Sequence, residues 1–259
     1  MSGAVVLLGP QRPSPNLGQA LLREQVRGPV ALITAGWRHD EDDVGPLTAA
    51  VGRDVVPLRL YHAFEALQLQ CPSLAETYRA RQARVLAYKT AYRIRLSTSL
   101  DAIRSLQPHV VDDPELFAPE LAEAVEQVRA LDEEVPVRLA GIRARAALEL
   151  ARCDDRVVPL QQSFAADLAR CGALAIAGGH VGVLRNRLRF FGLDEAIRSF
   201  VAQGRPLFAW GAGAMALCSR VVLFYDDPPD GPGDPEVLDE GVGLIDDVIC
   251  FPHARERLR

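Results

Sequence analysis

The strongest constraint on the fold is the order in which strand-like and helix-like segments follow one another. Short apolar runs bounded by Gly or Pro lie at residues 4–9, 30–36 and 55–60, and again at 173–177, 206–210, 221–225 and 248–251. Such runs are typical of strands, and helical patterns separate them at residues 17–26 and 193–202. Because the runs are apolar throughout, they indicate a mostly parallel sheet covered on both faces. The sequence therefore predicts a three-layer α/β protein.

A long helical block interrupts this pattern. From residue 64 to residue 152 the chain contains a single glycine, Gly141, and residues 74–106, 119–134 and 137–151 predict helices, the second beginning at Pro119. The block is too long for one crossover between strands. We expect an α/β domain formed by residues 1–63 and 156–259, and a helical insertion or cap formed by residues 64–155.

Composition excludes several classes of protein. Apolar residues make up 49% of the 259 residues and charged residues 24%, which is the mix of a folded globular chain. The net charge of −5 argues against general nucleic-acid binding. No apolar run is long enough for a transmembrane helix, so we expect no membrane partner. The first residues lack a positively charged signal-peptide region, which favours a cytoplasmic protein. The five cysteines show no zinc-binding spacing, and we expect no disulfide framework.

The most informative segment is residues 206–218, PLFAWGAGAMALC. An apolar strand runs directly into a turn of Gly and Ala and then into a helix. This is the layout of a nucleophile elbow, in which one side chain lies on a sharp, strained turn between strand and helix. Small neighbours are needed because the helix begins very close to the sheet.

Several motifs in the C-terminal part carry a resemblance to a known family. The segment Ala209–Ala214 aligns with G-x-S-A-G-A, Ala177–His180 aligns with G-G-G-N, Ile249–His253 aligns with I-N-P-H-F, and Asp226 or Asp227 follows the elbow at the expected distance. On these residues the chain resembles the peptidase E and cyanophycinase family of serine peptidases. The resemblance implies a class I glutamine amidotransferase-like fold. It covers residues 173–259 well and the first 60 loosely, but not the helical block.

The chain departs from that family at the nucleophile. The family's serine falls on Gly211, which has no side chain, so acyl transfer through this position is impossible. Cys218 lies about 10 Å further along the helix and cannot replace the serine; we interpret it as a buried helix residue. The resemblance therefore implies a member without serine peptidase activity.

The resemblance also implies an anion-binding pocket formed by backbone amides. Gly178, Gly179 and Ala212 would supply these amides, and the helix that begins after Gly211, at Ala212 and Gly213, would add its N-terminus. Such a pocket would bind a small-molecule or peptide-like anionic ligand. The alternative is a vestigial turn that binds nothing.

Histidines follow four of the predicted strands, at His39, His62, His180 and His253. In a parallel sheet these positions lie along the carboxyl edge, where ligands bind. By the resemblance, His180 and His253 would flank Gly211, with Asp226 or Asp227 behind His253. This arrangement could act as an acid/base pair or bind a divalent metal, with His39 a weaker candidate ligand. We therefore expect either no cofactor or a divalent metal.

Two further segments follow strands at the same edge. The run 37–43, WRHDEDD, could bind cations or a basic substrate, but a solvated acidic turn in which an Asp caps a helix is the simpler interpretation. Residues 10–13, PQRP, could contact a ligand.

The helix predicted over residues 77–100 carries six basic residues and no acid. At about 100° per residue these residues split between two flanks, with apolar faces between them. This pattern favours use in a core or in an interface, including one between the subunits of a homo-oligomer, over phosphate binding.

Three functional hypotheses follow. The chain is a binding or regulatory protein that keeps the pocket without the nucleophile. Alternatively, it is a hydrolase or lyase of altered chemistry that uses His180, His253 and Asp226 or Asp227. The third possibility is an interaction protein that works through its helical block.

Overall fold

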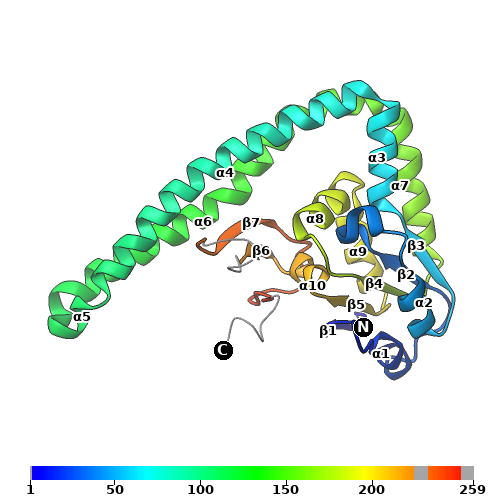
Figure 1. Cartoon of the computed structure of the whole chain (residues 1–259), viewed down its shortest axis with the longest axis horizontal. Coiled ribbons are helices and arrows are strands. Elements are labelled where there is room, and N and C mark those ends of the chain that lie inside the picture. Colours follow the sequence, from blue (N-terminus) through cyan, green and yellow to red (C-terminus); the bar gives the residue numbers. More distant parts are fainter. Residues whose placement is uncertain (1, 225–232, 252–259) are drawn as a thin grey trace. The chain divides into compact units, whose positions relative to one another are not determined.

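The computed structural model describes residues 2–224 and 233–251, and these divide between two compact units (Figure 1). Unit 1 comprises Met1–Pro72, Arg152–Val221 and Glu240–Arg259, and unit 2 comprises Ser73–Ala151 and Val222–Asp239. The domain limits expected at residues 64 and 155 stay a prediction. Within the described ranges, none of the helices combines the length and the hydropathy needed to cross a bilayer.

Unit 1 is built on a parallel five-stranded sheet. Its strands are β1 (Val5–Leu8), β2 (Val30–Ile33), β3 (Val55–Leu58), β4 (Ala173–Ile176) and β5 (Leu207–Trp210), in the spatial order β1-β5-β4-β2-β3. Every residue of the three central strands is buried, which explains why their sequences are apolar without alternation. The predicted α/β class is confirmed, and the sheet is consistent with a class I glutamine amidotransferase-like fold.

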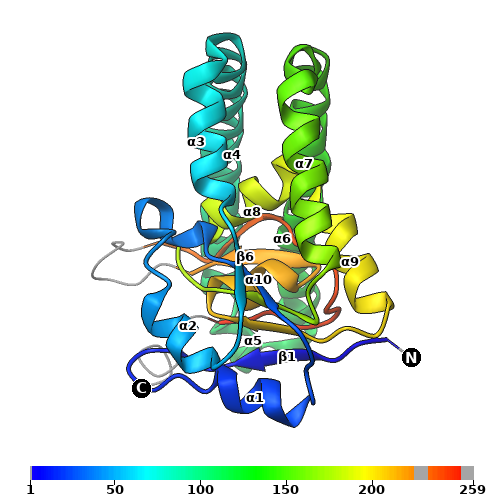
Figure 2. The same cartoon turned by 90° about the vertical axis from the view of Figure 1, so that its right-hand side faces the viewer.

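Helices flank the sheet. Helices α1 (Leu17–Arg23) and α2 (Gly45–Val51) pack against one face, in a core with alternate residues of β2 and β4 and with Phe208 and Trp210 of β5. Helices α8 (Val181–Phe190) and α9 (Leu193–Ala202) lie on the side opposite to α1 (Figure 2). Two further helices of unit 1, α3 (Leu60–Gln70) and α7 (Asp154–Ala169), contact each other, and α7 also contacts β3. One 3-10 segment, η1 (Ala35–Asp40), follows β2, and another, η2 (Ala151–Cys153), precedes α7.

The C-terminal part of the sheet prediction is corrected. The strand expected at residues 221–225 is observed as β6 (Arg220–Leu223), but it pairs with β7 (Glu236–Glu240) in a separate two-stranded sheet. Part of the expected 225–239 loop is therefore strand. Residues 248–251 do not form the expected strand. Their apolar side chains Val248, Ile249 and Phe251 are exposed, because no neighbouring strand supplies them with a ladder or a covering layer within the described residues.

The cysteine expectation also needs correction, since Cys71, directly after α3, is disulfide-bonded. Cys171, Cys218 and Cys250 are free thiols.

Unit 2 contains the helices α4 (Pro72–Leu106), α5 (His109–Asp112) and α6 (Pro114–Leu150). The helix start expected at Pro119 is wrong: α6 begins at Pro114, and the carboxylate of Asp113 accepts the backbone N–H of Leu116 at 3.2 Å. Asp113 therefore caps the helix, and Pro114 takes the first position, which suits its missing N–H. The segments expected at residues 119–134 and 137–151 form one continuous helix.

Strand β7 contributes to the core of unit 2. Val237 packs with Tyr92 and Leu96 of α4 and with Leu131 and Val135 of α6. The Tyr92 hydroxyl donates to Asp132 at 2.6 Å and accepts the backbone N–H of Val237 at 3.2 Å. Residues 236–239 therefore pack in the helical unit although they are far from its helices in the sequence.

Charged residues hold β7 against the helices. Lys89, which is 3% exposed, donates to the carbonyl oxygen of Val237. The Arg93 guanidinium binds both carboxylate oxygens of buried Glu236 at 2.8 Å. Arg143 pairs with buried Asp239. The basic face of α4 is thus used at Lys89 and Arg93 for packing within the unit, as the core interpretation predicted.

Burial lowers the pKa of Lys89 from 10.5 to about 8, although the nearby carboxylates of Glu236 and Asp239 oppose the shift. Between pH 8 and 10.5 an unfolded chain keeps this proton while the folded chain loses it, so the free energy of unfolding rises with pH. Between pH 7.5 and 9.5, we expect the free energy of unfolding of wild type to rise by about 1–2 kcal/mol relative to that of Lys89→Met. Urea unfolding of both proteins at the two pH values measures this gain; parallel pH profiles would contradict it.

Candidate ligand-binding site

The turn between β5 and helix α10 (Ala212–Leu217) has the conformation of a nucleophile elbow. Gly211 lies at its apex with φ +52° and ψ −125°, a region that favours glycine. A Cβ atom built on Gly211 would lie 3.4 Å from the Cα of Gly178, which is ordinary van der Waals contact. The elbow therefore keeps space for a side chain but presents none.

The second glycine of the elbow is needed for a different reason. A Cβ atom on Gly213 would lie 2.2 Å from the carbonyl oxygen of Ile176 in β4. No side chain can occupy that space, because the first turn of α10 lies directly against the end of the neighbouring strand. Gly213 thus sets the close approach that places Gly211 at the carboxyl edge of the sheet.

The turn after β4 meets the elbow. A Cβ atom on Gly178 would lie 3.6 Å from the backbone nitrogen of Ala212. Gly179 has φ +110°, and the next residue, His180, donates its backbone N–H to the carbonyl oxygen of Gly36 at 2.8 Å. The two glycine turns expected to cooperate are brought together. Their role in anion binding stays a prediction.

His180 caps helix α8. Its Nδ1 accepts the backbone N–H of Val183 at 3.2 Å, so the neutral ring carries its proton on Nε2. Desolvation lowers the pKa of His180, and the charge of Arg38 lowers it further. Arg38 itself has φ +59° and ψ −119°, a strained backbone conformation for a residue with a side chain.

His39 and His62 interact with side chains outside the glycine turns. His39 contacts Tyr61 edge-on, with Nε2 3.5 Å from the hydroxyl. His62 lies beside two carboxylates, with Nδ1 3.5 Å from Glu41 and 3.3 Å from Asp42. Across residues 2–224 and 233–251, no three His, Cys, Asp or Glu side chains are arranged to hold a metal ion. His253, Asp226 and Asp227 lie outside the described residues.

The acidic run after β2 has a structural use at Glu41. This residue is 1% exposed and accepts the backbone N–H groups of Tyr61 at 2.9 Å and of His62 at 2.8 Å, which are first-turn donors of α3. Burial raises the pKa of Glu41 while the two hydrogen bonds oppose the shift. The capping part of this interpretation is supported, but the capping residue is Glu41 and not an aspartate, and it is buried and not solvated.

A loop between β1 and α1 forms one wall of the site. The Gln11 side chain donates to the carbonyl oxygen of Gly9 at 2.8 Å and to Asn16 at 2.7 Å. Its oxygen accepts the backbone N–H groups of Asn16 at 3.0 Å and Leu17 at 2.9 Å, which caps α1. One buried amide thus fixes the shape of the intervening loop.

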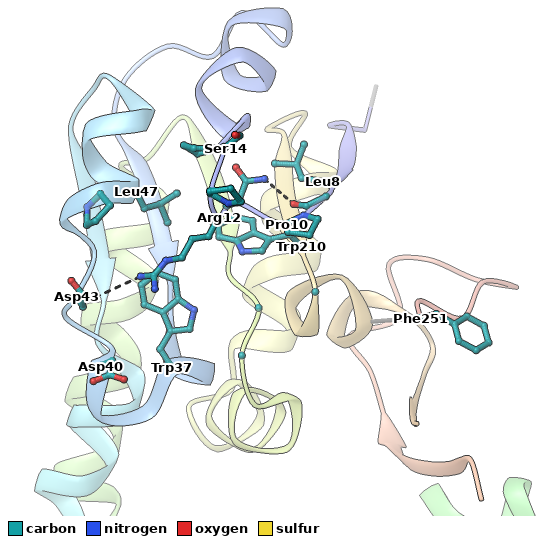
Figure 3. Close-up of a pocket in the computed structure, with 18 residues that line it drawn as sticks. Leu8, Pro10, Arg12, Ser14, Trp37, Asp40, Asp43, Leu47, Trp210 and Phe251 are labelled. Carbon is teal, nitrogen blue, oxygen red and sulfur yellow. Dashed lines mark hydrogen bonds and ion pairs between the residues drawn. The ribbon is translucent and has the colours of Figure 1, made fainter. Parts of the chain in front are cut away.

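The glycine turns and this loop enclose a cavity of about 1100 Å³ (Figure 3). Arg12 extends across it, with its guanidinium 5.6 Å from the centre of the Trp37 ring and 3.6 Å from the carboxylate of Asp43. The expected residues 10–13, Gly178, Gly179 and Gly211 line the cavity, together with Trp37, Asp40 and Asp43 of the run 37–43. Trp210 and Phe251, which belong to two of the aligned motifs, also line it. The remaining lining residues were not singled out by the sequence: Leu8, Gly9, Ser14, Pro15, Pro46 and Leu47. His180 and Gly213 are not among the lining residues.

The two elbow glycines make a matched pair of substitutions. We expect Gly213→Ala to lower the free energy of unfolding by about 3 kcal/mol or to prevent folding, because its Cβ would overlap the Ile176 carbonyl oxygen. Gly211→Ala should lower the free energy of unfolding by only about 1 kcal/mol, because the added Cβ has space and the only penalty is the positive φ. Chemical denaturation of both variants measures the order; a larger loss at Gly211 would contradict it.

The His180 cap predicts a pH effect. Protonation of Nδ1 removes the acceptor for Val183, and the lowered pKa means that the folded state resists this protonation. The unfolded state therefore takes up the proton first as pH falls below 6.5, and stability decreases. Between pH 7.5 and 5.5, the free energy of unfolding of wild type should therefore fall further than that of His180→Asn, whose amide caps at both pH values. Equal losses in denaturation curves would exclude the effect.

Two known groups of proteins match this chain. The family model described as Peptidase family S51 matches residues 142–259. Pyridoxal 5'-phosphate synthase subunit PdxT of Renibacterium salmoninarum is 28% identical over 109 residues, which cover 42% of this chain and 42% of that protein. The chain thus spans less than half of this relative's length. Together with the parallel sheet and the elbow, these matches support a likeness to the peptidase E-like, class I glutamine amidotransferase-like family.

Proposed function

We propose that this chain is a peptidase E-like protein that binds a small anionic or peptide-like ligand without cleaving it through a serine. The observation that carries the proposal is Gly211, which takes the elbow conformation at the edge of the cavity and offers no nucleophile. A protein of this kind serves as a binding or regulatory partner rather than as a peptidase. The expected cytoplasmic location belongs to the same proposal.

The cavity supports ligand binding over a vestigial turn. A collapsed site would bury Gly211, whereas Gly211 is exposed and opens into a space of about 1100 Å³. The side chains that line this space include one cation, Arg12, and two carboxylates, Asp40 and Asp43. An anionic group is therefore best placed at the glycine turns, with a polar or cationic group of the same ligand toward the aspartates.

A second candidate is an enzyme of altered chemistry that uses His180, His253 and Asp226 or Asp227, with or without a divalent metal. The observation that favours it is the lowered pKa of His180, which keeps the imidazole neutral near pH 7. Its Nδ1 is engaged by Val183, so a base or metal ligand would have to use the ring's other nitrogen. Use of unit 2 for interaction or for homo-oligomerisation stays a prediction.

Restoring the hydroxyl tests the catalytic half of the proposal. We expect wild type to show no hydrolysis of acidic dipeptides or isoaspartyl peptides, since no acyl-enzyme can form at Gly211. Gly211→Ser should gain measurable hydrolysis over wild type, and Gly211→Ala, which shares the strained backbone but lacks a hydroxyl, should not. Release of free amino acid measures the rate. Hydrolysis by wild type itself would refute the proposal.

Binding can be measured in the same protein without substitution. Trp37 and Trp210 are the chain's two tryptophans, and both line the cavity. Titration with an acidic dipeptide should give a saturable change in tryptophan fluorescence. Arg12→Ala should bind the dipeptide more weakly, because the substitution removes a cation that lines the cavity. A flat titration in wild type would favour the vestigial turn.

A further inference from the structure

Two free thiols lie next to each other beside the elbow helix. The Sγ atoms of Cys218 and Cys250 are 3.6 Å apart although the residues are 32 positions apart in the sequence. Cys218 is the C-cap of α10 and is fully buried, whereas Cys250 is only half-buried. Both belong to unit 1.

The backbone holds the two cysteines together. The backbone N–H of Ser219 donates to the carbonyl oxygen of Ile245 at 3.0 Å, and that of Leu244 donates to Leu217 at 2.9 Å. Cys218 also forms a parallel β-bridge with Ile245. Asp247 then adopts φ +57°, a local turn between Ile245 and Cys250. The segment that leads to Cys250 is therefore anchored to the end of α10 at Leu244 and Ile245, five residues before Cys250.

We propose that Cys218 and Cys250 are a site of reversible disulfide formation, which fastens residues 246–251 to the end of α10. The inference rests on the thiol geometry and is independent of the proposed function. Because the two sulfur atoms are already in contact, closing the bond requires side-chain adjustment and no rearrangement of the hydrogen-bonded segment.

The oxidant we assign is a low-molecular-weight disulfide. The thiolate of Cys250, the less buried residue, attacks a sulfur of the oxidant, forms a mixed disulfide and releases one small thiolate. The thiolate of Cys218 then attacks the Cys250 sulfur and releases the second. Two protein thiols are oxidised, one small disulfide is reduced to two thiols, and the two protons pass to those thiols.

The bond would act at the cavity. Phe251, which follows Cys250 directly, lines the cavity with Gly211 and Trp210. A disulfide at Cys250 therefore fixes the position of one cavity-lining side chain relative to α10. Burial and the neighbouring thiol raise the pKa of Cys250 to about 11, so the thiolate is scarce at neutral pH and oxidation should be slow there and faster at pH 9.

The test is incubation of the wild-type protein with oxidised glutathione, followed by blocking of free thiols and tryptic mapping. Arg220 lies between the two cysteines, so trypsin separates them unless a disulfide joins their peptides. We expect one linked pair of peptides that contains Cys218 and Cys250, formed several times faster at pH 9 than at pH 7. Dithiothreitol should separate the pair again.

Variants assign the product. Cys250→Ser should abolish the linked peptides, and Cys171→Ala should leave them unchanged, because Cys171 is a buried free thiol whose Sγ donates to the backbone of Asp167. The melting temperature of oxidised wild type should exceed that of the reduced protein by roughly 5 °C, with no such gain in Cys250→Ser. Recovery of Cys218 and Cys250 from wild type as separate blocked thiols, or only as mixed disulfides with glutathione, would overturn the proposal.

Discussion

The close approach of helix α10 to strand β4 is the constraint on which the rest of the site depends. Only hydrogen fits at Gly213 opposite the Ile176 carbonyl oxygen, and this contact places the start of the helix above the sheet edge. Gly211 then takes its strained turn, and Gly178 comes within contact distance of it. A single backbone-to-backbone contact therefore determines where two turns from distant parts of the sequence meet.

The turn at Gly211 has the elbow conformation although glycine offers no nucleophile. A strained turn is normally retained because a reactive side chain needs it, but glycine adopts the same dihedral angles at little cost. The elbow, and the cavity beside it, therefore do not require a reactive side chain at position 211. The cavity wall formed by the Gln11-braced loop and by Trp37 does not depend on the residue at position 211.

The sequence predicted those features that depend on local chemistry. Short motifs mark the buried central strands, the elbow and the glycine turn after β4. In each of them the local backbone geometry or burial requires the residue types that are present. Features that depend on distant partners escaped prediction. Residues 236–240 sit in a segment rich in Pro, Gly and Asp, yet they form β7 because Lys89 and Arg93 of α4 bind them. Phe251 lines the cavity although its apolar run indicated a strand, and Glu41 is buried because two N–H groups of a later helix require an acceptor.

The burial of Lys89 has a practical consequence for the helical unit. It is the chain's single lysine among 28 arginines, and it lies 3% exposed beneath β7. A protease specific for lysine can therefore cut this polypeptide at one bond, and in the native state only while β7 and α4 have separated. The rate of that single cut reports how often the helical unit opens. It can be measured from the appearance of two fragments on a gel.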